Sequence, residues 1–353
     1  MEILSTSERD LEQAATALAG GALVAFPTET VYGLGADAFN SSALARIFEA
    51  KNRPRFDPLI IHIADPLSLP LIADTSALSK TSARRLSILS ERLWPGPLTL
   101  ILPKRAEVPG LATAGLASVA VRFPSHPVAQ KLIRLSTGAV AAPSANPFGC
   151  LSPTRASHVI RQLGEKADFI IDGGRTQVGV ESTVLDILGE IPRILRPGGT
   201  SRETIETLIG KVEFSQPPSL EPGGEASDSA AAPVSPGQLK SHYAPTTPLI
   251  LHKTGELASL PEAPEEGRLY FSLPAASIVP GGARRGFPGS RSAQPAIRVL
   301  SETGDLCEAA ANLFDMLHEL DGLGLSLIRA EEAPESGLGA AINDRLRRAE
   351  NSP

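Results

Sequence analysis

Apolar residues recur along the first 211 positions in two kinds of spacing. Intervals of three and four residues predict helices, and short runs rich in β-branched residues predict buried strands. The strand candidates are 22–28, 58–64, 98–103, 118–124, 138–146, 168–174 and 182–188. The helix candidates are 10–20, 43–53, 79–92, 126–136 and 155–164. Many strands joined by short helical crossovers predict a mixed α/β domain.

The pattern changes after residue 211. Residues 217–237 are rich in Pro, Gly, Ala and Ser, which is typical of an extended linker. Beyond the linker, the predicted strands are 248–252, 268–274, 296–302 and 325–330, and the predicted helices are 305–321 and 340–350. We therefore expect a catalytic domain at 1–211, a linker at 212–247 and a smaller α/β domain at 248–353.

The composition is that of an ordinary globular protein, with 42% hydrophobic and 20% charged residues among 353. Uninterrupted apolar runs fall short of the roughly 20 residues that span a bilayer. The polar, acidic N-terminus lacks the features of a signal peptide. The two cysteines, Cys150 and Cys307, are too far apart to suggest a disulfide framework or a metal site. We expect a cytoplasmic protein.

The net charge of −6 is unevenly distributed, because residues 1–211 carry +2 and the remainder carries −8. A protein that coats nucleic acid shows a strong basic excess, which is missing here. Any RNA contact must therefore be local. An anionic small molecule such as ATP suits the mildly positive N-terminal part at least as well.

Residues 27–35, PTETVYGLG, follow a predicted strand directly. Open α/β sheets bind ligands at such strand ends, where Thr28 and Thr30 offer hydroxyl groups. Gly33 and Gly35 would let the backbone approach a ligand. A simple glycine-containing turn explains the same residues.

Three cations stand in informative places. Lys51 and Arg53 alternate along a short segment, so they can converge on one anion, although a solvated basic helix end gives the same pattern. Arg122 lies inside an apolar strand, where a charge needs a partner. A structural ion pair and a ligand contact both satisfy that need.

Polar residues also follow other predicted strands. Ser144, Asn146, Ser182 and Arg196 can hold phosphate or sugar, whereas Ser and Asn can equally cap the next helix. His62 is either a core histidine whose ring nitrogens are hydrogen-bonded within the protein or a contact to a polar ligand.

Several known catalytic motifs are missing from the sequence. The chain lacks the phosphate-binding and dinucleotide-binding glycine motifs, cysteines and histidines at the spacing of a zinc site, and the nucleophile elbow of hydrolases. The remaining side chains fit nucleotidyl transfer by positioning and charge neutralisation.

The order of these motifs is more specific than any one of them. The chain carries, in sequence, PTETVYGLGADA, PLIIHI, WPGPLTLIL, VAVRFPSHP, AAPSAN, IIDGG, ESTVLD and RPGG. In this order it resembles the YrdC/Sua5 family throughout residues 8–210. Residues 235–245, SPGQLKSHYAP, resemble the linker of the longer Sua5 members, and residues 337–349 resemble the tail of bacterial ones.

The resemblance implies a YrdC-like twisted mixed sheet with a large central cavity, followed by a Rossmann-like Sua5 domain. It also implies a nucleotidyltransferase that converts L-threonine, bicarbonate or CO2 and ATP, with Mg²⁺, to threonylcarbamoyl-AMP and diphosphate. A downstream threonylcarbamoyl transferase complex would then modify adenosine 37 of tRNAs that read codons beginning with A. Contact of this chain with tRNA would be indirect or weak.

The resemblance also assigns residues by position. The threonine side would comprise Thr30, His62, Arg122, the backbone of Ala142, and Ser182. The ATP side would comprise Arg53, Asp57, Ser118, Ser144, Asn146, Ser152, Arg196 and Tyr243, with Lys51 and Arg53 as the catalytic cations. No resident metal ligand is implied.

The chain departs from the family pattern at Asp57 and Gln238, where many relatives carry Asn and Met. A carboxylate beside a polyphosphate is repulsive unless it faces Mg²⁺. Tyr243 would either contact the nucleotide as part of a lid or merely anchor the second domain.

Two rival functions follow from the same fold. An RNA-binding module is disfavoured by the net charge and by an aromatic content of 4%. A carbamoyltransferase like the YrdC-like module of hydrogenase-maturation proteins would bring zinc-finger-like parts, for which two cysteines are too few.

Overall fold

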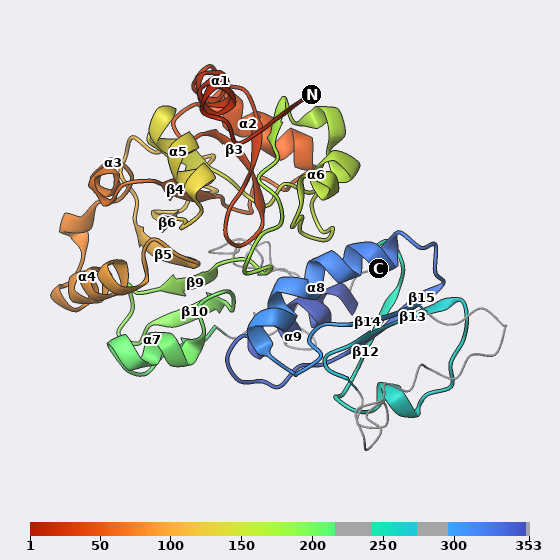
Figure 1. Cartoon of the computed structure of the whole chain (residues 1–353). Coiled ribbons are helices and arrows are strands. Elements are labelled where there is room, and N and C mark those ends of the chain that lie inside the picture. Colours follow the sequence, from red (N-terminus) through yellow and green to blue (C-terminus); the bar gives the residue numbers. More distant parts are fainter. Residues whose placement is uncertain (216–241, 274–295, 351–353) are drawn as a thin grey trace, which may run out of the picture. The chain divides into compact units, whose positions relative to one another are not determined.

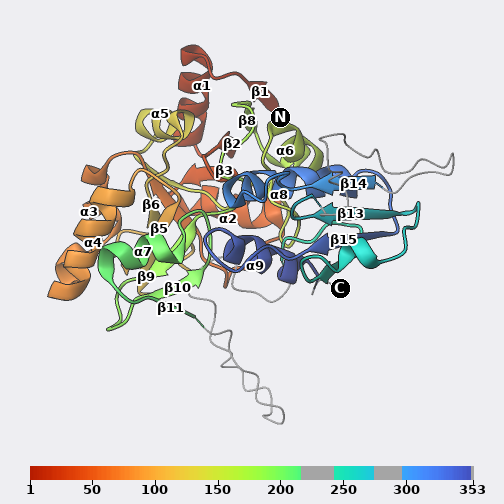
Figure 2. The same cartoon turned by 60° about the horizontal axis from the view of Figure 1, so that its bottom comes forward.

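The N-terminal part of the chain builds an eleven-stranded mixed sheet (Figure 1). The computed structural model describes residues 1–215, 242–273 and 296–350. Along the sheet the strand order is β1-β8-β2-β3-β7-β4-β6-β5-β9-β10-β11, so β1 and β11 are the edge strands (Figure 2). The strands are β1 (Glu2–Leu4), β2 (Val24–Pro27), β3 (Tyr32–Asp37), β4 (Ile60–Ile63), β5 (Leu98–Pro103), β6 (Ser118–Arg122), β7 (Ala139–Ala141), β8 (Phe169–Ile171), β9 (Thr183–Asp186), β10 (Arg193–Arg196) and β11 (Glu213–Phe214).

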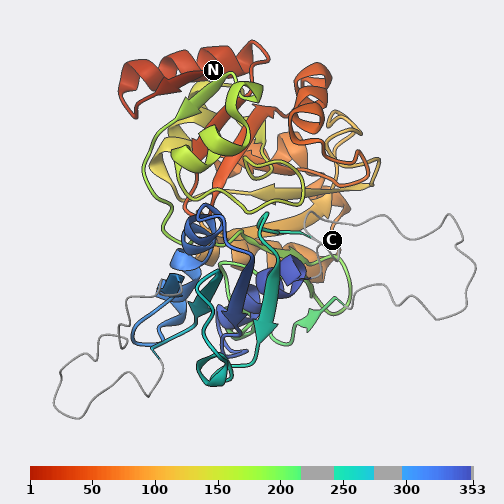
Figure 3. The ribbon, with the colours of Figure 1, turned by 90° about the vertical axis from the view of Figure 1, so that its right-hand side faces the viewer.

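Helices connect these strands and cover the sheet. They are α1 (Glu8–Ala19), α2 (Ser41–Lys51), α3 (Leu69–Ile72), α4 (Lys80–Leu93), α5 (Pro127–Leu135), α6 (Ala156–Gln162) and α7 (Arg202–Ile209), with the short 3₁₀ helices η1 (Pro66–Ser68), η2 (Thr75–Ala77) and η3 (Gly164–Lys166). Helix α1 follows β1 near the N-terminus (Figure 3) and packs against α5. Every helix and strand predicted for residues 1–211 is present, within a few residues of its expected bounds.

The two faces of the central strands differ in polarity. Ile61, Val121, Leu100 and Leu185 are in register on β4, β6, β5 and β9 and belong to the main core. Because side chains alternate across a strand, the residues next to them point to the other face. That face carries a small apolar cluster comprising Ile60, Ile101, Ala120, Val184 and Leu195, and beside it a row of polar residues.

Strand β3 was not predicted, and it corrects the role assigned to the two glycines of the 27–35 motif. Gly33 and Gly35 lie within β3, where glycine is normally disfavoured. A Cβ on Gly35 would lie 2.7 Å from Phe26 and 2.9 Å from Val140, and one on Gly33 would lie 3.2 Å from the Cβ of Ala142. These glycines therefore admit side chains of the neighbouring strands rather than a ligand.

Strands β1, β10 and β11 and helices α3 and α7 were also missed. Most of them are short or lie at the edge of the sheet, where tertiary pairing rather than local pattern decides the structure. Helix α7 has a clear start, because Ser201 accepts a hydrogen bond from the Thr204 N–H as its N-cap.

A second sheet lies in the C-terminal part of the chain. Its four parallel strands, in the order β12-β15-β13-β14, are β12 (Leu249–His252), β13 (Glu266–Tyr270), β14 (Ala296–Val299) and β15 (Leu327–Glu331). Helix α8 (Leu306–Asp321) contacts β13, and α9 (Gly339–Glu350) contacts both α8 and β12; η4 (Leu257–Ser259) is a short 3₁₀ helix. These elements confirm the predicted second α/β domain. The predicted linker 217–237 lies outside the described residues.

The chain divides into two units, and their bounds differ slightly from a division at one point in the sequence. Unit 1 comprises Met1–Phe148, Pro153–Thr176 and Glu181–Leu239, and unit 2 comprises Gly149–Ser152, Gln177–Val180 and Lys240–Pro353. The two short segments belong to unit 2 by direct contact. The His318 imidazole on α8 hydrogen-bonds to the Ser152 carbonyl at 3.1 Å, and Gly179 leaves no room for a Cβ against the backbone of Ala310. Within the described ranges, we find no helix long and apolar enough to cross a membrane.

Candidate active site

A polar row crosses the sheet of unit 1 on the face opposite the main core. The strand registers place His62 of β4 beside Arg122 of β6, Arg122 beside Thr99 of β5, and Thr99 beside Val184 of β9, which in turn pairs with Arg196 of β10. Residues paired in register point to the same face, and strands are about 4.8 Å apart. The backbones of the two arginines in the row are therefore roughly 14 Å apart across the sheet.

The Arg122 guanidinium is buried and forms an ion pair. Its Nη2 lies 2.7 Å from a carboxylate oxygen of Glu29, and its Nε donates a long hydrogen bond, 3.4 Å, to the Gly96 carbonyl. The side chains of Arg122 and Glu29 are 4% and 5% exposed. Both alternatives raised for Arg122 therefore remain compatible with its position, since an ion pair exists and its strand partners are polar.

A tight turn between β2 and β3 presents the residues around Glu29. The Thr28 and Thr30 hydroxyls hydrogen-bond to each other at 2.8 Å, and the Thr28 hydroxyl also donates to the Val31 carbonyl at 2.7 Å. Each of these side chains is buried. The turn therefore holds Glu29 in place while its two flanking hydroxyl groups stay fixed.

Hydroxyl groups link the middle of the row to Arg196. The Thr99 and Ser182 hydroxyls are 2.8 Å apart. The Arg196 Nη2 donates to the Ser182 carbonyl at 2.9 Å and to the Ser182 hydroxyl at 3.3 Å. Ser182 thus lies between Thr99 and Arg196 and shares hydrogen bonds with both.

Lys51 is the last residue of α2, which ends where Asn52 adopts a left-handed conformation with φ 51°. This termination turns the Lys51 side chain inward, where its Nζ donates to the Ser144 carbonyl at 2.6 Å and to the Asn146 carbonyl. Ser144 forms a β-bridge with Gly33 of β3. The structure therefore brings Lys51 to the backbone of Ser144 and Asn146, two residues that the family resemblance assigns to the same pocket.

Arg53 and Asp57 form a second buried ion pair, 2.9 Å apart. Arg53 also donates to the carbonyls of Asp57 and Pro58 at 3.1 and 2.8 Å. Burial raises the pKa of the Asp57 carboxyl, although the charges of Arg53, Lys51 and Arg196 act in the opposite direction. Arg53 is thus packed within the protein, so it is not the solvated helix end considered above.

His62 is fully enclosed. Its Nδ1 lies 3.2 Å from the Ile60 carbonyl, and burial together with the charge of Arg122 lowers its pKa to about 3. The imidazole is therefore neutral at physiological pH and can act only as a hydrogen-bonding group.

The other predicted site residues occupy different places. Ser118 begins β6, and Asp57 precedes the parallel β4, so these two residues lie toward the same N-terminal end of the two neighbouring strands. The Ala142 amide donates to the Ile60 carbonyl at 3.0 Å, which leaves its carbonyl as the group to consider. Ser152 and Tyr243 belong to unit 2, where Tyr243 is buried between Phe314 and the Arg345 guanidinium, 5.2 Å from its ring.

Two buried residues of this site were missed. Glu29 stands between the two motif threonines, and Thr99 is the only hydroxyl in the strand LTLILP. A polar residue inside an otherwise apolar strand, and a charge within a run of small residues, were the available signals.

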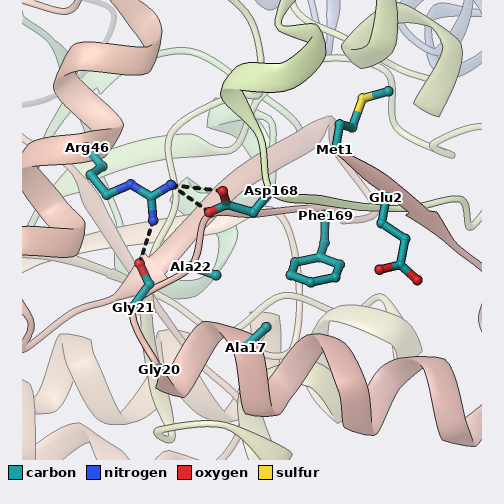
Figure 4. Close-up of a pocket in the computed structure, with 9 residues that line it drawn as sticks. All are labelled: Met1, Glu2, Ala17, Gly20, Gly21, Ala22, Arg46, Asp168 and Phe169. Atoms are coloured by element: carbon teal, nitrogen blue, oxygen red, sulfur yellow. Dashed lines mark hydrogen bonds and ion pairs between the residues drawn. The ribbon is translucent and has the colours of Figure 1, made fainter.

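A hollow also lies where strands β2 and β8 begin (Figure 4). The residues of the candidate site follow the other end of β2. The hollow is lined by Met1, Glu2, Ala17, Gly20, Gly21, Ala22, Arg46, Asp168 and Phe169. Arg46 pairs with Asp168 at 2.8 Å and donates to the Gly21 carbonyl at 3.0 Å. These bonds join α2 to the sheet, so Arg46 has a structural role here.

Comparison with known proteins covers nearly the whole chain. The Sua5–YciO–YrdC family model, described as telomere recombination, matches residues 16–198, and a model described as the threonylcarbamoyl-AMP synthase C-terminal domain matches residues 200–350. The threonylcarbamoyl-AMP synthase of Pyrococcus abyssi is 43% identical over 93% of this chain and 90% of its own length. That of Bacillus subtilis is 41% identical over 98% and 94%.

A solved structure agrees with these relatives. The crystal structure of P. abyssi Sua5 complexed with L-threonine superimposes with a TM-score of 0.82 and 38% identity, covering 99% of this chain and 98% of that one. From the two matched domains, the row of buried polar residues and these relatives, we conclude that the chain belongs to the Sua5 family of threonylcarbamoyl-AMP synthases.

Proposed function

We propose that this enzyme of the nucleotidyltransferase type joins L-threonine, CO2 or bicarbonate, and ATP into threonylcarbamoyl-AMP, with release of diphosphate. The observation that carries the proposal is the buried polar row, with Arg122 toward one end and Arg196 toward the other. Two separated cations on one sheet face suit a reaction that must hold an amino-acid carboxylate and a nucleotide phosphate at once. The RNA-binding interpretation is not favoured, since the relatives named above are synthases.

Threonine would bind at the Arg122 end. The guanidinium pairs with the substrate carboxylate, while neutral His62 and the Thr30 hydroxyl are suited to hydrogen-bond its polar groups. Ser182 and the Ala142 carbonyl complete this side. A site that pairs a substrate hydroxyl by buried hydrogen bonds rejects analogues that lack it.

ATP would bind at the other cations. Arg53, Lys51 and Arg196 supply positive charge, and the charges of all three lower the pKa of the Asp57 carboxyl against the effect of burial. Ser118, Ser144, Asn146, Ser152 and Tyr243 are the proposed additional contacts. The closed cavity implied by the family resemblance, which would protect a labile acyl-adenylate from water, is part of this proposal.

The proposed chemistry needs no covalent enzyme intermediate. The threonine amine captures CO2 as a carbamate, and a carbamate oxygen attacks the α-phosphorus of ATP. The bond from that phosphorus to the bridging oxygen breaks, and diphosphate leaves with the electron pair. Lys51, Arg53 and Arg196 stabilise the negative charge that accumulates on the phosphate oxygens.

The residues fit a magnesium ion that arrives with ATP. Asp57 is buried and one of its carboxylate oxygens pairs with Arg53 at 2.9 Å, but within the described ranges neither oxygen accepts a hydrogen bond. Mg²⁺ commonly takes one or two protein carboxylates and fills its other positions with phosphate and water. When bound, it would neutralise charge on the phosphates. This explains how a carboxylate can stand where many relatives have Asn.

We also propose the cytoplasm as the compartment and a separate threonylcarbamoyl transferase complex as the consumer of the product, acting on adenosine 37 of tRNA. The domain boundaries predicted above, at residues 211 and 247, remain part of the same proposal.

The test is diphosphate release by the purified protein with each substrate omitted in turn. Release should require ATP, L-threonine, bicarbonate and Mg²⁺ together. Equal release without threonine would leave only an ATP hydrolase.

A further inference from the structure

Glu29 is a buried carboxylate that has hydrogen-bonding capacity left over beside its ion pair with Arg122. The residue is 3% exposed. Among the residues that the structure describes, neither of its carboxylate oxygens accepts a hydrogen bond; its ion pair with Arg122, at 2.7 Å, lacks hydrogen-bond geometry. Buried polar groups almost always find partners, because each one left unsatisfied costs free energy. A donor from outside the chain would remove this cost.

The donor must be compatible with the groups around Glu29. Arg122 faces it from β6, and half-buried His126, the N-cap of α5, is close enough for the Glu29 charge to raise its pKa against the effect of burial. The neighbouring residues Thr28 and Thr30 are bonded to each other. A carboxylate has about four lone-pair sites, so Glu29 can keep Arg122 and still accept from another donor.

An α-amino acid supplies the matching pattern. Its ammonium and carboxylate groups are attached to one carbon, so a receptor needs an anion and a cation side by side. Glu29 and Arg122 are such a pair, and both are buried, where charge complementarity is stronger than in water.

We propose that Glu29 accepts the α-ammonium group of threonine and takes the proton that this group must lose before it can react with CO2. This inference rests on the proposed threonine site at Arg122. The amine lone pair then forms the N–C bond while one C–O π pair of CO2 moves onto oxygen. The second proton lost from nitrogen passes to solvent, which leaves the carbamate. Glu29 is thus a catalytic residue of the carbamate-forming step.

Binding tests the ammonium contact independently of turnover. Calorimetry would compare L-threonine with the analogue that carries a hydroxyl in place of the ammonium group, on the wild type and on Glu29→Gln. A charge-assisted hydrogen bond corresponds to about ten- to hundredfold in affinity. The wild type should prefer threonine by that factor, and Glu29→Gln should lose most of the preference. An unchanged preference in the variant overturns the inference.

The pH profile tests the proton transfer. General-base catalysis contributes about 10²–10⁴-fold, so kcat/KM for threonine should fall at least a hundredfold in Glu29→Gln at neutral pH. The deficit should shrink at higher pH, where solution supplies the free amine, while the KM for ATP stays unchanged. A deficit that is independent of pH would indicate a structural role and would contradict the proposal.

Controls separate the possible failures. Glu331→Gln makes the same change at a buried glutamate of unit 2 and should leave the threonine preference intact. If Glu29→Gln does not fold, Glu29→Asp can replace it in these tests. Glu29→Asp keeps the negative charge, but its shorter side chain moves the carboxylate away from the substrate amine. The threonine preference should therefore persist while the rate falls about a hundredfold. A wild-type rate for Glu29→Asp would overturn the proposal. If the wild type does not bind threonine, the proposed threonine site itself is wrong; if it does, only the Glu29 inference is at stake.

Discussion

Replacing Arg122 by Met should destabilise unit 1 strongly, because it leaves Glu29 buried without a counterion. Both side chains are at most 5% exposed. Breaking a buried pair by removing one partner costs about 3–5 kcal/mol, most of it from the charge left behind. At about 2–4 °C per kcal/mol for a domain of this size, the melting temperature of Arg122→Met should fall by roughly 6–20 °C.

The fold offers a matched control at Arg46. Arg46 and Asp168 are 2.8 Å apart, which is nearly the separation of Arg122 and Glu29, but their side chains are 44% and 33% exposed. Exposed pairs contribute about 0–1 kcal/mol. Arg46→Met should therefore shift the melting temperature by no more than a few degrees.

A double variant isolates the unpaired charge as the cause. Replacing a complete buried pair by neutral side chains is often close to neutral, so Glu29→Gln/Arg122→Met should melt well above Arg122→Met alone. Differential scanning calorimetry of Arg122→Met, Glu29→Gln, the double variant and Arg46→Met, each compared with the wild type, measures these shifts. Equal melting temperatures for Arg122→Met and Arg46→Met, or additive losses in the double variant, would refute the reasoning.

Three further predictions concern single residues. Arg53→Ala should lower the rate with ATP about a hundredfold or more, whereas exposed Arg55→Ala should not; equal rates in a diphosphate assay would remove Arg53 from the site. His62 has a pKa of about 3 in the fold against 6.5 ordinarily, so the stability it contributes is present above pH 6.5 and is lost as pH falls toward 3. The melting temperature of the wild type should therefore fall more steeply below about pH 6.5 than that of His62→Gln, and parallel falls in the two proteins would contradict this. Tyr243→Ala removes a ring buried against Phe314 and should destabilise unit 2 by about 3–5 kcal/mol, while calorimetric ATP binding by the same variant tests the proposed nucleotide contact.

The local spacing of apolar residues was sufficient to predict most helices and strands. It failed for elements whose structure depends on tertiary contacts. The strand around Arg122 and the helix ending at Lys51 follow from apolar spacing and could be read directly. Strand β3 could not, because its glycines are unfavourable in isolation and are required only once Phe26 and Val140 pack over them. The same limit applies to edge strands, whose pairing partners are remote in sequence.

The sequence proposed the site as a set of residues but not as a geometry. Motif order indicated Arg122, Ser182 and Arg196, yet only strand register places the two arginines on one face of the sheet, and only hydrogen bonds place Ser182 beside Arg196. Glu29 was overlooked because burial, rather than residue type, makes its carboxylate notable. For Tyr243 the sequence left two roles open. The structure shows the ring buried among residues of unit 2, which is the packing that an anchoring role requires.

The central claim is that one active site joins threonine, a carboxyl carbon from bicarbonate, and AMP. The most direct test incubates the purified protein with ATP, Mg²⁺, L-threonine and ¹³C-bicarbonate, followed by immediate mass spectrometry of the nucleotide products. The account predicts a threonylcarbamoyl-AMP ion that carries the heavy carbon and is absent when threonine is omitted. A threonyl-AMP ion without the added carbon, or AMP formation that does not depend on threonine, would contradict it.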